Sequence, residues 1–267
     1  MSEPENLQDT IDSSSRMVEA MRLFSRTSVR AVELLGSISG ARQTVEKTMP
    51  FGKEALELEN IQTVLDILED SDLSEIFKDP AAMKQGQYRE FARNITDKSI
   101  SSASSFVSAA SLVFAHGVFD ATLFDYCRVS ALWVWKDWFE LIKSRKVSIE
   151  QVEQATKYQM LLKSVDDYLT QLERESILKK ADILHQVIKP GNYQTTVRDY
   201  AYSRDKLQAI DRARHDAVHK LRFREGFGEI DDTIDYLRKT VVYFMGLLHR
   251  RYGLKIDPNI STDEIPR

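Results

Sequence analysis

The chain has 267 residues, of which 42% are hydrophobic and 29% are charged, a globular composition long enough for one large domain or two modest ones. Its 41 acidic and 37 basic residues give a net charge of −4, so any nucleic-acid binding requires a local basic patch. The single cysteine, Cys127, excludes an internal disulfide framework and a cysteine zinc cluster, and it fits a reducing compartment.

The amino-terminal part predicts helices separated by a connection. Residues 1–15 are polar and predict a mobile tail without a secretory signal. Apolar residues at helical spacing predict helices over 16–35 and 53–69. Between them, 36–52 carries three glycines and a proline and predicts mostly a connection. We expect 1–99 to form an additional helical region, whose role the sequence does not indicate.

The middle of the chain predicts a short polar helix over 83–94 and a long central helix over 102–129. Although 106–132 is strongly apolar, serines and charged residues interrupt it, which favours a core helix over a membrane span. Three tryptophans follow the central helix and predict core packing rather than a base-stacking platform: Trp133, Trp135 and Trp138.

The carboxyl-terminal half predicts only helices. Ser148 and Gln151 form a capping box that opens a helix ending near Thr156. Further helices are expected over 160–173, 175–188, 203–223 and 231–252, with a break at 190–192 and a tail over 256–267. No stretch alternates with the period of a strand, so the sequence predicts an all-α fold.

The stretch RARHDAVHKLRF, residues 212–223, contains one arginine that contradicts its helical pattern. On a helical wheel the apolar stripe comprises Leu207, Ile210, Ala217, Val218 and Leu221. Arg214 falls in the middle of that stripe. Because a buried guanidinium is costly unless it is paired, Arg214 must find an anion or face a polar crevice.

Three interpretations of Arg214 and its neighbours compete. In the first, Arg214 forms a structural ion pair with Asp120 or Asp125 of the central helix. In the second, His215 and His219 bind zinc, which is disfavoured because no third ligand motif is evident. In the third, the helix performs metal-independent phosphoryl chemistry on RNA: a histidine moves protons and an arginine stabilises the charged phosphate.

The third interpretation is supported by a resemblance. The motif R-H-D-A-V-H-K and its flanking segments resemble the HEPN family (higher eukaryote and prokaryote nucleotide-binding) across residues 100–255. The flanking segments are D-K-L-Q-A-I-D-R, I-D-D-T-I-D-Y-L-R-K-T-V-V-Y-F-M and A-H-G-V-F-D-A-T-L-F-D-Y. The resemblance implies an up-and-down helical bundle, a homodimer, and metal-independent endoribonuclease activity through a composite cleft. It implies Arg214 and His219 as the catalytic pair.

The resemblance also implies supporting residues and a biological setting. His215 and Asp216 would orient the pair or contact RNA, and Asp120 would be the supporting acid. The local charge agrees with this: a basic patch of Arg212, Arg214, Lys220, Arg222 and Arg224 suits backbone phosphates. We expect no cofactor and no metal. We expect a cytoplasmic location without membrane association. The expected role is that of a toxin or phage-defence effector, with an antitoxin or regulatory protein as its partner. The alternative is a non-catalytic helical module that binds a nucleotide or a protein partner.

Overall fold

The computed structural model describes residues 7–48, 85–142, 157–188, 202–220 and 227–257, and every regular element within these ranges is a helix. This confirms the all-α fold class. The predicted helices over 53–69 and 148–156, and the break at 190–192, lie outside the described residues.

The elements follow one another along the chain, with gaps where residues are not described. They are α1 (Leu7–Thr48), α4 (Gln85–Trp133), the 3-10 helix η2 (Trp135–Trp138), α5 (Phe139–Ile142), α7 (Lys157–Leu172), α8 (Ile177–Ile188), α9 (Arg204–Lys220) and α10 (Phe227–Tyr252). The four helices predicted in the carboxyl-terminal half are therefore present, with ends that differ by a few residues.

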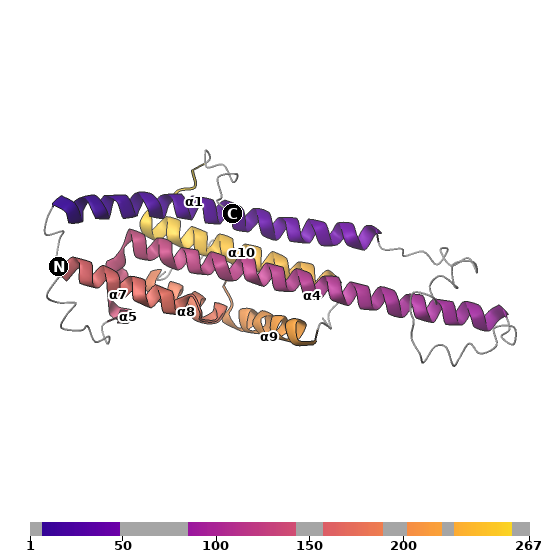
Figure 1. The fold of residues 1–267 in the computed structure, drawn as a ribbon. Coiled ribbons are helices and arrows are strands. Elements are labelled where there is room, and N and C mark those ends of the chain that lie inside the picture. Colours follow the sequence, from indigo (N-terminus) through magenta and orange to yellow (C-terminus); the bar gives the residue numbers. More distant parts are fainter. Residues whose placement is uncertain (1–6, 49–84, 143–156, 189–201, 221–226, 258–267) are drawn as a thin grey trace.

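Helix α4 runs through the centre of the molecule. Helices α1 and α10 lie along one side of it, while α7, α8 and α9 follow one another along the other side (Figure 1). Thr27 of α1 donates to Asp125 of α4 at 2.8 Å, and Ser28 shares a hydrogen bond of 2.9 Å with Tyr126. These contacts join adjacent residues of α1 to adjacent residues of α4, and so fix the register of the two longest helices.

Three predicted boundaries in the amino-terminal half are wrong. Helix α1 begins at Leu7, inside the expected tail, and continues through the expected connection to Thr48. Helix α4 begins at Gln85 as one helix instead of two. Leu35 is buried, and Arg42 and Ser39 bond to Asp231 of α10, so tertiary contacts hold α1 helical past Gly36 and Gly40. Residue 99, the predicted domain boundary, lies inside α4.

The core is apolar and is built from all the long helices. Leu112, Phe119 and Leu123 of α4 are fully buried, together with Phe244 of α10 and Leu35 of α1. Trp138 is also fully buried and donates its indole N–H to Ser130 Oγ at 3.2 Å, which confirms the predicted core role for this tryptophan.

The segment Phe106–Trp133 of α4 is long and apolar enough to cross a membrane by length and composition alone. Half of its most apolar window is buried inside the molecule. A buried central helix of a helical bundle has the same composition, because it is surrounded by apolar neighbours.

His185 makes folding sensitive to acid. Its Nε2 lies 2.7 Å from Tyr243 Oη, and its ring packs against Tyr202 and Phe244. Burial lowers the pKa of His185 below the ordinary 6.5, against a smaller opposing effect of Asp182. The folded protein therefore favours the neutral imidazole. Below about pH 6.5, unfolding is accompanied by uptake of a proton at His185.

We expect the His185 contribution to stability to be complete above pH 6.5 and to be lost as the pH falls toward the lower pKa of the folded state. Urea midpoints measured at about pH 7.5 and about pH 5.5 test this, with His185→Gln as the variant that cannot titrate. The variant should lose less stability on acidification than the wild type. An equal loss in both proteins would show that other groups cause the effect.

Candidate functional site

Helix α9 carries the motif that the sequence singles out, and it packs against α4 and α8. Ser203 precedes the helix and its Oγ accepts from the Lys206 N–H at 3.4 Å, a side-chain cap that favours the helix start. Leu207, Ile210 and Ala217 are buried. Three positions of the predicted apolar stripe are thus confirmed, while Val218 is 40% exposed.

Arg214 is half-buried on the buried side of α9, and its Nε atom is inaccessible to solvent. No acceptor within the described ranges bonds to this Nε. A buried donor without a partner costs free energy, a cost that Arg16 of α1 carries as well.

The structural ion pair considered for Arg214 is not present among the described residues. Asp120 lies 2.7 Å from Nζ of Lys180 on α8, and Asp125 accepts from Thr27 of α1. Both carboxylates of the central helix are therefore engaged elsewhere. The supporting role predicted for Asp120 stays a prediction, but the partner that the structure gives it is Lys180.

A second histidine lies close to the motif. His116 of α4 is 8% exposed, and its Nε2 lies 3.0 Å from Oδ1 of Asp211 on α9. Asp211 precedes Arg214 by three residues, which is about 4.5 Å along the helix axis. This contact fixes the position of α9 against α4 next to Arg214. The sequence carries no signal for it, because the two residues are 95 positions apart.

The remaining predicted residues are distributed along the same helix. Arg212, His215 and Asp216 are exposed. His219 and Lys220 belong to the last turn of α9, but their side chains lie outside the described part of the structure, as does all of Arg222. Within the described residues, no group of three potential metal ligands comes together.

Comparison of the chain with family models, with curated proteins and with solved structures finds no match. Functional assignment therefore depends on the residues of α9, their contacts with α4, and the resemblance of the motif.

Proposed function

We propose that the protein is a metal-independent endoribonuclease of HEPN type, with Arg214 and His219 as its catalytic pair. The 2′-hydroxyl oxygen of a ribose attacks the adjacent phosphorus, and the bond from phosphorus to the 5′-oxygen breaks. The attacking hydroxyl loses its proton and the leaving oxygen gains one, so atoms balance without a cofactor. The products are a 2′,3′-cyclic phosphate and a 5′-hydroxyl.

The two residues have complementary roles in this reaction. His219 acts as the general acid or base, because an imidazole can exchange protons near neutral pH. Arg214 donates hydrogen bonds to the non-bridging oxygens, where negative charge grows in the transition state. Arg212, Lys220 and Arg222 attract the phosphates on either side, and His215 and Asp216 orient the pair or contact the RNA.

The observation that carries the proposal is that Arg214, half-buried on the packed side of α9, makes no hydrogen bond or ion pair with any described residue. A non-catalytic module would be expected to pair this guanidinium inside its own chain. An arginine that waits for a phosphate has the opposite property, since its acceptor arrives with the substrate. The contact between His116 of α4 and Asp211 of α9 supports the proposal, because it fixes the position of α9 relative to α4.

The resemblance further suggests the setting. The active protein would be a homodimer, in which a twofold axis brings two copies of the motif into one cleft. We place it in the cytoplasm as a toxin or defence effector, controlled by an antitoxin or regulatory protein.

The test is RNA cleavage by the purified full-length chain in the presence of EDTA. We expect cleavage to persist, and end analysis of the fragments to show cyclic phosphates and 5′-hydroxyls. Addition of divalent metal ions should not raise the rate substantially. Failure to cleave any cellular RNA would contradict the proposal and favour the non-catalytic module.

A further inference from the structure

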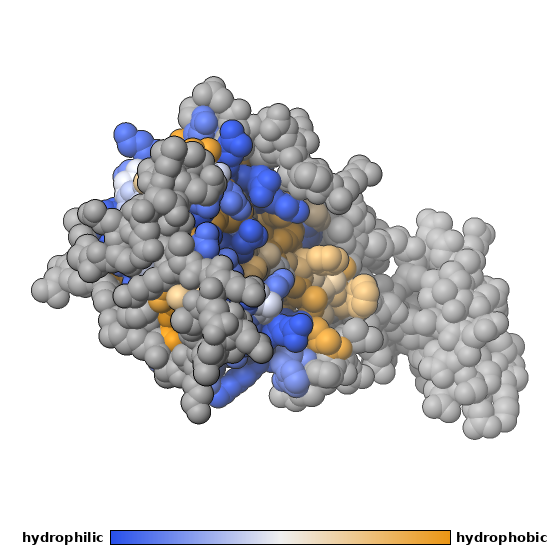
Figure 2. Space-filling view, turned by 60° about the vertical axis from the view of Figure 1, so that its left-hand side comes forward, coloured by the Kyte–Doolittle hydropathy of each residue, from blue (hydrophilic) through white to orange (hydrophobic). Residues whose placement is uncertain are grey.

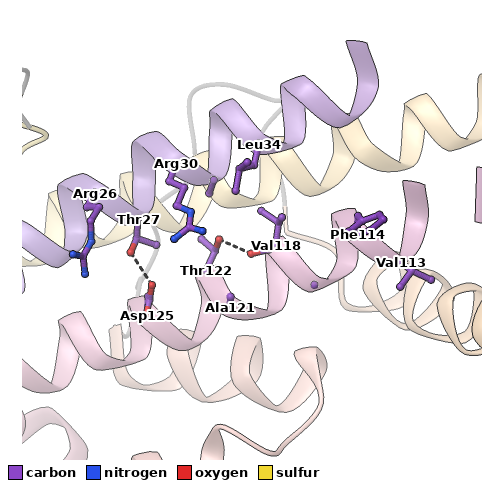
Figure 3. A pocket seen from close by; sticks show the side chains of 12 residues that line it. Arg26, Thr27, Arg30, Leu34, Val113, Phe114, Val118, Ala121, Thr122 and Asp125 are labelled. Carbon is purple, nitrogen blue, oxygen red and sulfur yellow. Dashed lines mark hydrogen bonds between the residues drawn. The ribbon is translucent and has the colours of Figure 1, made fainter. Parts of the chain in front are cut away.

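A groove of about 650 Å³ lies between α1 and α4, away from α9. Arg26, Arg30 and Leu34 line it from α1, and Phe114, Gly117 and Val118 line it from α4 (Figure 3). The groove combines two exposed arginines, which have no partner among the described residues, with an exposed aromatic ring.

The arginines of the groove have no acidic partner among the described residues. Arg26 and Arg30 are exposed, and neither makes a hydrogen bond or an ion pair with any described residue. They are four residues apart, so they project from the same face of α1 about 6 Å from each other along the axis. In Figure 3 both extend from α1 toward α4. Two adjacent free guanidinium groups are suited to successive phosphates of one strand.

The aromatic ring in the groove is also exposed to solvent. Phe114 is 69% exposed, the most exposed large hydrophobic residue among those described. Gly117 follows it by one helical turn, and a side chain at that position would meet nothing within 4 Å, so the wall beside Phe114 is open. Figure 2 shows a face of the molecule on which apolar side chains are open to solvent among strongly polar ones. A flat ring in an open groove is a surface on which an unpaired base can stack.

The groove also has an acidic end. Asp125 lines it, but its carboxylate accepts from Thr27 at 2.8 Å and lies 4.0 Å from Arg128. The negative charge is thus partly compensated, and phosphates are expected nearer to Arg30 than to Asp125.

The groove and α9 lie on different sides of α4, at the same level of that helix (Figure 1). Gly117 of the groove directly follows His116, which contacts Asp211 of α9.

We propose that this groove binds a single-stranded segment of RNA, with Arg26 and Arg30 on its phosphates and Phe114 stacked on a base. The assignment of RNA as the ligand rests on the proposed function. Grooves for single strands combine positive charge along the backbone with an aromatic platform for the bases, which is the arrangement found here. The groove extends substrate binding beyond the catalytic pair.

The experiment measures binding separately from cleavage. A fluorescent single-stranded oligonucleotide with 2′-O-methyl riboses cannot be cleaved, because its attacking hydroxyl is blocked, and its affinity for the full-length protein is measured by anisotropy. We expect Arg26→Ala with Arg30→Ala to weaken binding about tenfold or more, and to reduce the slope of log affinity against log salt by about 1.4. Phe114→Ala should weaken binding about tenfold without changing that slope.

A matched control removes the same charge elsewhere. Arg250→Ala with Lys179→Ala replaces two exposed cations on other helices, and it should leave affinity within about twofold if the groove is the site. Equal affinities of the groove variant and this control would overturn the proposal. Tighter binding of a polyglutamate peptide than of the oligonucleotide would also overturn it, since it would indicate an acidic protein partner. If the wild type cleaves no RNA but the groove variants lose binding, the groove stands and the nuclease proposal fails.

Discussion

Substitution of Arg214 by methionine is expected to lower RNA cleavage about a hundredfold or more while leaving the protein as stable as the wild type or more stable. The loss of rate follows from removing a donor to the oxygens on which charge develops. The gain in stability, about 1 kcal/mol, follows from removing a buried Nε that has no acceptor among the described residues. Methionine keeps an unbranched apolar side chain beside Leu207, Ile210 and Ala217.

Cleavage rates and urea unfolding measured on the same preparations test this expectation. His219→Ala is the second arm and should also reduce cleavage about a hundredfold, because the acid or base is removed. Arg212→Met is the matched control: it removes the same charge two residues away from an exposed position, and it should affect both readouts less. If Arg214→Met instead lowers stability and spares cleavage, the arginine is structural and the non-catalytic interpretation is favoured.

Asp120→Ala is expected to give the largest loss of stability, about 3 kcal/mol, because it leaves the ammonium group of Lys180 without its carboxylate. The Lys180 side chain is only 2% exposed, and its Nζ lies 2.7 Å from Asp120 Oδ1. Urea unfolding monitored by circular dichroism at neutral pH measures the effect.

The double variant separates the structural role of Asp120 from its predicted role in catalysis. Lys180→Met removes the charge that needs compensation, so Asp120→Ala with Lys180→Met should recover most of the lost stability. Cleavage by this stable double variant then reports on the site alone. A rate equal to that of Lys180→Met would mean that Asp120 acts only through Lys180, whereas a further loss would support the predicted supporting role.

The fold class could be predicted because helical periodicity is a local property. The residues that make α9 amphipathic, such as Leu207 and Ile210, are neighbours in the chain. The same apolar stripe identified Arg214 as the residue that contradicts the pattern. Local signals failed where they competed with tertiary contacts. Gly36 and Gly40 indicated a connection, yet the bond from Arg42 to Asp231 keeps α1 helical around and beyond them.

The sequence could not predict which partners the charged residues have in the folded protein. It allowed Arg214 to pair with Asp120 or Asp125, but the structure joins these carboxylates to Lys180 and Thr27. Such choices depend on the rotation and register of helices that meet from distant parts of the chain. No local pattern encodes that geometry.

The sequence by itself therefore determined the all-α class and the helix on which the candidate site lies. Only the tertiary structure decided that the Nε of Arg214 is buried without an acceptor among the described residues, that His116 holds α9 through Asp211, and that Arg26, Arg30 and Phe114 share one groove. The physical reason is the separation of the interacting residues along the chain. Helix formation depends on side chains within one or two turns, whereas burial, pairing and grooves arise from the packing of whole helices.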